Sequence, residues 1–194
     1  MDERSLVLAS SSPYRRALLL QLMIPFISVS PEIDEAHKIG EKVETYVTRL
    51  AFEKARAASV KAPGSVIIGA DQAASLDGHP LSKPESVDNA RLQLAALSGR
   101  TIVFWNGLCV WDDIEKQAHE ALVPVTVKFK TLSATQIERY LEREPAIDCA
   151  GSLKSEGLGI ALCDSIESTD PTALIGLPLI TLTGLLEKVG IYAV

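Results

Sequence analysis

Short apolar runs alternate with amphipathic stretches along this chain, and this alternation predicts a mixed α/β fold. The apolar runs of strand length are residues 6–9, 26–30, 66–70, 101–111, 121–129 and 158–163. The stretches with the apolar spacing of a helix are residues 15–22, 41–59, 88–97, 133–141 and 179–189. The chain has no internal repeat and no Pro- or Ser-rich linker, so the pattern predicts a single domain over residues 1–194.

Turn and cap residues fix several of these boundaries. Ser12 is placed to cap the first helix, with Pro13 at the first helical position. Asp77-Gly78 is a dipeptide typical of a hairpin turn. Ser133 and Gln136 have the spacing of a capping box, which predicts a helix beginning there.

Composition excludes several classes of protein. Hydrophobic residues make up 47% of the chain, which supports a buried core and excludes a disordered protein. The net charge of −6 argues against a nucleic-acid partner, because nucleic-acid binders carry a basic face. No apolar run reaches the roughly 18 residues of a membrane span, so we expect no membrane partner. We also expect no signal peptide. The three cysteines lack CxxC spacing and are odd in number, which is typical of a reducing compartment, so the sequence predicts a cytoplasmic protein.

The first candidate site is the turn between the first strand and the first helix. A helix N-terminus offers unpaired N–H groups and the positive end of the helix dipole, and both attract anions. Ser10 and Ser12 add hydroxyl groups to this turn, while Arg15 and Arg16 add positive charge. The turn suits a phosphate group, but the same residues also suit a simple capped helix with two solvated arginines.

The second candidate is Asp71, which directly follows the apolar run 66–70. Open α/β sheets bind their ligands at the carboxyl ends of strands. A buried carboxylate is costly unless it is paired, hydrogen-bonded or bound to a metal ion. Asp71 can therefore hold Mg²⁺ against a phosphate or accept a proton from water, or it can simply form a turn.

Further charged residues have a less specific signal. Glu32, Asp34 and Glu35 lie in one loop and are oxygen ligands of the kind that Mg²⁺ or Mn²⁺ prefers. Lys54 falls in a predicted helix and Lys83 precedes a proline. Each of these residues, taken alone, also fits an ordinary solvated surface.

In combination, these segments resemble a known family. The matching segments are residues 8–16, 32–35, 50–55, 69–72, 83–84, 150–152 and 176–178. In sequence and order they are similar to the Maf family of nucleotide pyrophosphatases, which is related to the inosine triphosphate pyrophosphatases. The resemblance implies an elongated α/β fold with a mixed sheet and two lobes flanking a central cleft. It also implies hydrolysis of a nucleoside triphosphate to the monophosphate and pyrophosphate, with Mg²⁺ or Mn²⁺ as cofactor.

The resemblance assigns roles to individual residues. It implies that phosphate is bound by Ser10, Arg15, Arg16, Lys54 and Lys83. It further implies that Asp71 is the proton acceptor and that Asp71 and Glu32 are ligands of the cation.

The resemblance also implies that three residues read the base of the nucleotide, namely Tyr14, Gln72 and Glu156. Family members commonly carry Arg in place of Tyr14 and Gln in place of Glu156, and an aromatic residue with this Glu resembles the subgroup that hydrolyses 7-methyl-GTP. Methylation at N7 makes guanine cationic, which favours stacking on an aromatic ring. A carboxylate can accept hydrogen bonds from the guanine N1–H and N2–H₂ groups. Ser82 and Ala173 depart from the family pattern near Lys83 and the final helix.

The sequence is also compatible with two other functions. One is a dTTP or UTP pyrophosphatase of the same family, and the other is a non-catalytic nucleotide-binding regulator of cell division. The presence of Asp71 together with Lys54 and Lys83 favours an enzyme, because a pure binder does not need a carboxylate that activates water. Since closed symmetric oligomers are most often dimers, a homodimer is the expected assembly.

Overall fold

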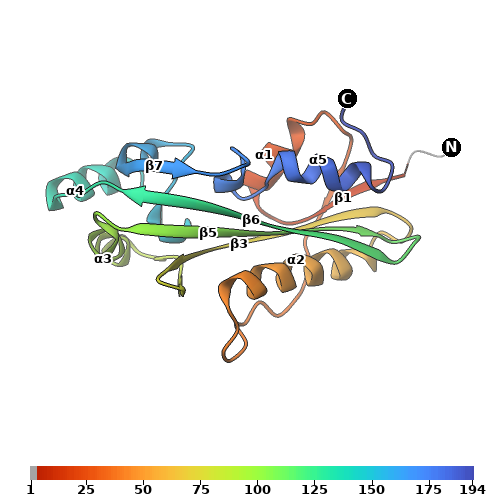
Figure 1. Ribbon diagram of the computed structural model, residues 1–194, viewed down its shortest axis with the longest axis horizontal. Helices are drawn as coiled ribbons and strands as arrows, with labels where there is room; N and C mark the ends of the chain where they lie inside the picture. Colours follow the sequence, from red (N-terminus) through yellow and green to blue (C-terminus); the bar gives the residue numbers. More distant parts are fainter. Residues whose placement is uncertain (1–3) are drawn as a thin grey trace. The chain divides into compact units, whose positions relative to one another are not determined.

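The computed structural model describes residues 4–194 and confirms the predicted α/β class (Figure 1). Within these residues, seven strands form one sheet, accompanied by five α-helices and three short 3₁₀ helices. The strands are β1 (Leu6–Ala9), β2 (Ile27–Val29), β3 (Val66–Leu76), β4 (His79–Leu81), β5 (Thr101–Asp112), β6 (Gln117–Phe129) and β7 (Cys163–Glu167). The α-helices are α1 (Pro13–Leu20), α2 (Val43–Ser59), α3 (Val87–Leu97), α4 (Ala134–Arg143) and α5 (Leu179–Glu187). The 3₁₀ helices are η1 (Ala150–Ser152), η2 (Leu158–Leu162) and η3 (Ala173–Ile175).

The sheet is mixed, as the family resemblance implies. Its strand order is β2-β1-β3-β5-β6-β7, and β4 pairs with β3 outside this path. Strand β1 runs parallel to both β2 and β3, while β3 pairs antiparallel with β4 and β6 pairs antiparallel with β7. The β3–β4 hairpin turns at Asp77-Gly78, where both residues have positive φ, as the sequence predicts.

The chain divides into two compact units. Unit 1 contains the described residues up to 72 together with 106–123 and 170–194, and unit 2 contains 73–105 and 124–169. Strands β3, β5 and β6 contribute residues to both units. The predicted central cleft and its flanking lobes stay a prediction.

In unit 1, helices pack against both faces of the strands. Alternate residues of β1, β3 and β5 pack on one face against α1 and α5, which lie together above these strands in Figure 1. The intervening residues of the same strands pack on the opposite face against α2. Because side chains alternate across a strand, a continuous apolar run is what a strand buried on both faces requires. The run 66–70 meets this requirement with every residue buried.

Helix α2 approaches the sheet so closely that two strand positions must be glycine. A Cβ atom on Gly69 would overlap the backbone carbonyl oxygen of Ala51, and one on Gly107 would overlap that of Val47. Both obstacles are helix backbone, which cannot rotate away as a side chain can. The two glycines therefore set the distance between α2 and the strands that it covers.

We predict that Gly69→Ala lowers the free energy of unfolding by about 3 kcal/mol, because the overlap forces α2 away from β3. Urea unfolding monitored by circular dichroism measures this change. The matched control is Gly184→Ala, because this glycine lies within α5 and a Cβ there meets nothing within 4 Å. The control is expected to be neutral or stabilising by up to about 1 kcal/mol, from helix propensity alone. Equal stability of the two variants would contradict the close approach.

Unit 2 contains α3 and α4, which pack against each other. Ser86 caps α3 by accepting a hydrogen bond from the N–H of Asn89 at 3.2 Å. The predicted capping box of α4 is confirmed, since Ser133 and Gln136 bond reciprocally to each other's backbone N–H. Local turn chemistry therefore defines where both helices begin.

One predicted strand is wrong. Residues 158–163 form the 3₁₀ helix η2 up to Leu162, and the strand β7 begins only at Cys163. The N–H groups of Gly157 and Gly159 both donate to the carbonyl oxygen of Lys154, at 3.2 and 3.0 Å. Two bonds to one carbonyl wind the chain too tightly for a strand. Of the apolar residues in this run, Leu162 and Cys163 are buried, while Leu158 and Ile160 are exposed.

The three cysteines form no disulfide within the described residues. Cys109 and Cys163 are buried, Cys149 is half-buried, and all three are free thiols. Burial raises the pKa of Cys109 to about 12, so this thiol stays protonated and unreactive at neutral pH. Among residues 4–194, no helix combines the length and apolar character needed to cross a membrane.

Candidate functional site

The turn between β1 and α1 is organised by its own serines. The Oγ of Ser12 accepts a hydrogen bond from the N–H of Arg15 at 3.3 Å and so caps α1, with Pro13 at the first helical position, as predicted. The Oγ of Ser10, which is buried, accepts from the N–H of Ser12 at 3.1 Å. These bonds leave the hydroxyl hydrogen of Ser10 available to an anion placed at the start of the helix.

The two arginines of this turn have different environments. Arg16 is exposed, whereas Arg15 is half-buried and donates from Nε to the carbonyl oxygen of Gly176 at 2.9 Å. Burial lowers the pKa of Arg15, and the negative charges of Asp71 and Glu35 act in the opposite direction. Arg15 remains charged at neutral pH, because a guanidinium titrates far above it. The positive charge of Arg15 therefore interacts with the carboxylates of Asp71 and Glu35.

Lys54 and Asp71 form a buried ion pair. The Nζ of Lys54 lies 2.6 Å from Oδ1 of Asp71 and 3.1 Å from Oε1 of Glu35. The side chains of Lys54 and Asp71 are only 7% and 9% exposed, so water screens their attraction little. Asp71 follows Gly69 by two positions and points to the same face of β3, toward α2. The close approach at Gly69 therefore brings Lys54 within reach of Asp71.

Glu35 is held near this pair by the docking of its loop on α2. The hydroxyl of Tyr46 donates to the carbonyl oxygen of Glu35 at 3.0 Å, and Arg49 donates to that of Ala36 at 3.1 Å. Arg49 also binds both carboxylate oxygens of Glu41, at 2.7 and 2.8 Å. This bidentate pair lowers the pKa of Glu41 to about 2, so it stays intact throughout the neutral range.

Glu32 lies elsewhere on this loop. Its carboxylate is exposed and pairs with Lys61 at 2.9 Å, and this hydrogen bond lowers the pKa of Glu32. The carboxylate that reaches Lys54 is that of Glu35, which the sequence marks only as one of three acids in the loop. Within the part of the chain that the structure describes, no three His, Cys, Asp or Glu side chains gather as a metal cluster. The role of Glu32 as a metal ligand stays a prediction.

Gln72 connects β3 to the segment before α5. Its Nε2 lies within hydrogen-bond distance of the Ala173 and Leu174 carbonyl oxygens, at 3.0 and 3.1 Å, and of Asn106 Oδ1 at 3.1 Å. These acceptors surround the amide nitrogen and fix the orientation of the side chain. The Ala173 contact uses its backbone carbonyl, so the departure from the family pattern at this position does not remove it.

Gly176 completes this arrangement beside Arg15 and Gln72. Its φ of +114° is unfavourable for any residue with a Cβ atom, and such an atom would sit 3.7 Å from Gln72 Oε1 and 3.8 Å from Arg15 Nε. The segment before α5 therefore packs directly against two residues that the sequence assigns to the nucleotide.

The remaining predicted residues are found in two places. Tyr14 is half-buried in the first turn of α1, in unit 1. Lys83 and Glu156 are exposed residues of unit 2, the first after β4 and the second in the turn 155–157. Unit 1 thus brings together Ser10, Arg15, Lys54, Asp71 and Gln72, while Lys83 and Glu156 belong to the other unit.

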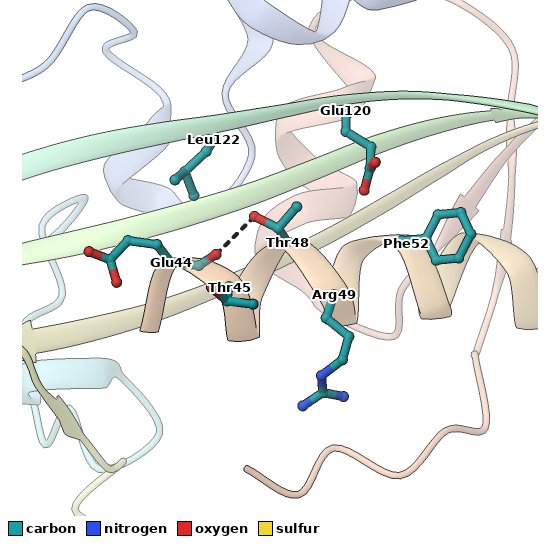
Figure 2. Close-up of a pocket in the computed structure, with 7 residues that line it drawn as sticks. All are labelled: Glu44, Thr45, Thr48, Arg49, Phe52, Glu120 and Leu122. Atoms are coloured by element: carbon teal, nitrogen blue, oxygen red, sulfur yellow. Dashed lines mark hydrogen bonds between the residues drawn. The ribbon is translucent and has the colours of Figure 1, made fainter. Parts of the chain in front are cut away.

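A pocket of about 520 Å³ in unit 1 lies over α2 and β6 (Figure 2). It is lined by Glu44, Thr45, Thr48, Arg49, Phe52, Glu120 and Leu122. None of these residues was predicted as a site residue, and Arg49 is already bound by Glu41 and Glu53. Its lining includes none of Arg15, Lys54 and Asp71.

Comparison with known proteins adds independent information. A family model described as "Maf-like protein" matches residues 5–189. A 7-methyl-GTP pyrophosphatase of Methylobacillus flagellatus is 50% identical over 186 residues, which cover 96% of this chain and 97% of that protein. Proteins of the same name from Pseudomonas aeruginosa and Bordetella pertussis are 47% and 46% identical, over 96% of this chain and 97% and 92% of their own lengths.

Proposed function

Because this chain belongs to the Maf-like protein family, as its sequence motifs predict, we propose that it hydrolyses 7-methyl-GTP to 7-methyl-GMP and pyrophosphate. The names of relatives that match nearly the whole chain support this substrate. The structural observation that carries the proposal is the buried ion pair of Lys54 and Asp71 in unit 1, with the charge of the half-buried Arg15 acting on the same carboxylate. It places a carboxylate beside two cations, as hydrolysis of a polyanionic substrate requires.

In the proposed reaction, water attacks the α-phosphorus and the α–β anhydride bond breaks, so the pyrophosphate leaves with the bond's electron pair. Asp71 accepts the proton that water loses. Lys54 and Arg15 offset the negative charge that develops on the transferred and leaving groups. Ser10 and Arg16 at the start of α1, and Lys83 in unit 2, bind phosphate oxygens.

A divalent cation is part of this proposal. The carboxylates of Glu35 and Asp71 already hold one cationic group, the ammonium of Lys54, between them. Two carboxylates suit Mg²⁺ or Mn²⁺, since these ions keep several water ligands and complete their shell with substrate phosphates. Glu35 and Asp71 would hold the ion, which when bound supplies positive charge to the phosphates. Glu32 remains the alternative ligand that the family resemblance implies.

We propose that Tyr14 and Glu156 read the methylated base. Tyr14 provides an aromatic face for the cationic ring, and Glu156 accepts hydrogen bonds from N1–H and N2–H₂. Gln72 acts differently, because its amide donors are directed at the Ala173 and Leu174 carbonyls. We propose that Gln72 influences specificity by holding this backbone segment.

A nucleotide panel tests the proposed function directly. Purified protein with Mg²⁺ or Mn²⁺ is given 7-methyl-GTP, GTP, dTTP, UTP and CTP, and the released pyrophosphate is measured. We expect 7-methyl-GTP to have the highest kcat/KM. A preference for dTTP or UTP would assign the chain to a pyrimidine pyrophosphatase, and no release from any nucleotide would favour a non-catalytic regulator.

The role of Glu156 makes a separate prediction. Replacing it in Glu156→Gln exchanges one acceptor oxygen for a donor, which should reduce the preference for 7-methyl-GTP over dTTP about tenfold. The ratio of kcat/KM values for the two nucleotides measures this preference. The control is Glu167→Gln, another exposed acid of unit 2, which should keep the wild-type ratio. An unchanged ratio in Glu156→Gln would remove this residue from base recognition.

A further inference from the structure

The turn that carries Glu156 is attached to the C-terminal end of α4, and two side chains of that helix end make the attachment. We infer that one of them, Glu144, is a positioning residue that sets the nucleotide preference by fixing the shape of this turn. The inference rests on the proposed reading of the base by Glu156.

Glu144 binds the turn on both sides of Glu156. Its Oε2 accepts a hydrogen bond from the backbone N–H of Leu158, and its Oε1 lies 3.1 Å from Nζ of Lys154. The side chain of Glu144 is 18% exposed, so these bonds are partly shielded from water. One side chain therefore ties down the residues two positions before and two positions after Glu156.

The backbone of the turn is shaped to receive this carboxylate. A Cβ atom on Gly157 would overlap both carboxylate oxygens of Glu144. The glycine directly after Glu156 thus leaves the room that the Glu144 carboxylate occupies.

Tyr140, one helical turn before Glu144, secures the start of the same segment. Its hydroxyl donates to the carbonyl oxygen of Ser152 and accepts from the N–H of Lys154, both at 3.2 Å. Burial is the main reason that the pKa of Tyr140 rises to about 12, so the hydroxyl keeps its proton. Tyr140 is fully packed in unit 2 and also supports the fold, whereas the carboxylate of Glu144 is directed at the turn.

Glu144 acts on the nucleotide only through Glu156, because Glu144 holds the backbone of the turn and Glu156 contacts the base. Glu156 is exposed and lies at the centre of the turn, so the backbone of the turn sets where its carboxylate is presented. Recognition by two hydrogen bonds tolerates displacements of only about 0.5 Å. Loosening the turn should therefore weaken the reading of the base and leave the binding of phosphate in unit 1 unchanged.

The test compares Glu144→Gln with Glu142→Gln, which neutralises an exposed acid on the same helix. Pyrophosphate release is measured for 7-methyl-GTP and dTTP, and thermal unfolding confirms that each variant is folded. We expect Glu144→Gln to reduce the kcat/KM ratio of the two nucleotides about five- to tenfold, mainly through KM for 7-methyl-GTP. The Glu142→Gln ratio should equal that of the wild type.

Gly157→Ala disturbs the contact between Glu144 and position 157 without changing Glu144. It tests the inference if Glu144→Gln does not fold. The added methyl group displaces the Glu144 carboxylate and should lower the ratio to a similar extent. A folded Glu144→Gln or Gly157→Ala with the wild-type ratio would overturn the inference. A wild-type protein without preference for 7-methyl-GTP would instead contradict the proposed function, so the two failures are distinguishable.

Discussion

Asp71→Asn is expected to lower kcat for pyrophosphate release about 10³-fold, within the range usual for loss of a general base. The amide has the same shape as the carboxylate and can still accept the hydrogen bond from Lys54 at Oδ1. It has no basic oxygen for the proton of the attacking water, and it is a poor ligand for a divalent cation. The fold should survive, because Glu35 remains as a charged partner of Lys54.

The matched control for this prediction is Asp77→Asn. Asp77 lies at the hairpin after the same strand, and its φ of +51° is one that Asn adopts as readily as Asp. It is exposed and pairs with Arg100, so its replacement should change turnover less than about twofold. If Asp71→Asn kept full turnover while remaining folded, Asp71 could not be the proton acceptor.

Much of the fold could be predicted from the sequence, because it depends on local signals. The run 66–70 is buried on both faces, and the capping box at Ser133 begins α4 where expected. The prediction failed at 158–163, where apolar residues suggested a strand. The segment instead begins with a tight turn in which the N–H groups of Gly157 and Gly159 both donate to the carbonyl oxygen of Lys154. Hydrogen bonds of this kind leave no signal in an apolar pattern.

The individual residues of the candidate site could be predicted from the sequence, but which of their side chains contact each other could not. Lys54 and Asp71 were both identified, yet their 2.6 Å contact depends on the close approach of α2 at Gly69. The sequence could not show that Glu35, and not Glu32, is the acid that reaches Lys54. A loop has no periodicity, and the contacts that orient this one come from Tyr46 and Arg49 of α2.

The same limit applies to Gln72 and Glu144. Gln72 donates hydrogen bonds to carbonyl oxygens about a hundred positions further along the chain, and no local sequence pattern predicts such a contact. Glu144 lies three residues beyond the predicted helix 133–141, and its sequence context gives it no special role. Only the overlap between its carboxylate and a Cβ at Gly157 shows that the two positions depend on each other.

Lys54→Met should lower kcat/KM about 10²- to 10³-fold, the usual cost of removing one group that stabilises developing charge. It should also destabilise the protein by about 3 kcal/mol, because the Asp71 carboxylate stays buried without its ammonium partner. The control is Lys61→Met, which removes an exposed lysine paired with Glu32. Its stability should change by less than about 1 kcal/mol.

The double variant Lys54→Met/Asp71→Asn separates these two effects. A neutral amide at position 71 no longer suffers from the missing ammonium, so the double variant should regain about 2 kcal/mol of the stability that Lys54→Met loses. Its turnover should not recover, because the proton acceptor is absent as well. Urea unfolding and pyrophosphate release measure the two quantities on the same samples. Stability losses that simply add would show that Lys54 and Asp71 do not interact in the folded protein, and the site proposed around them would then have to be rejected.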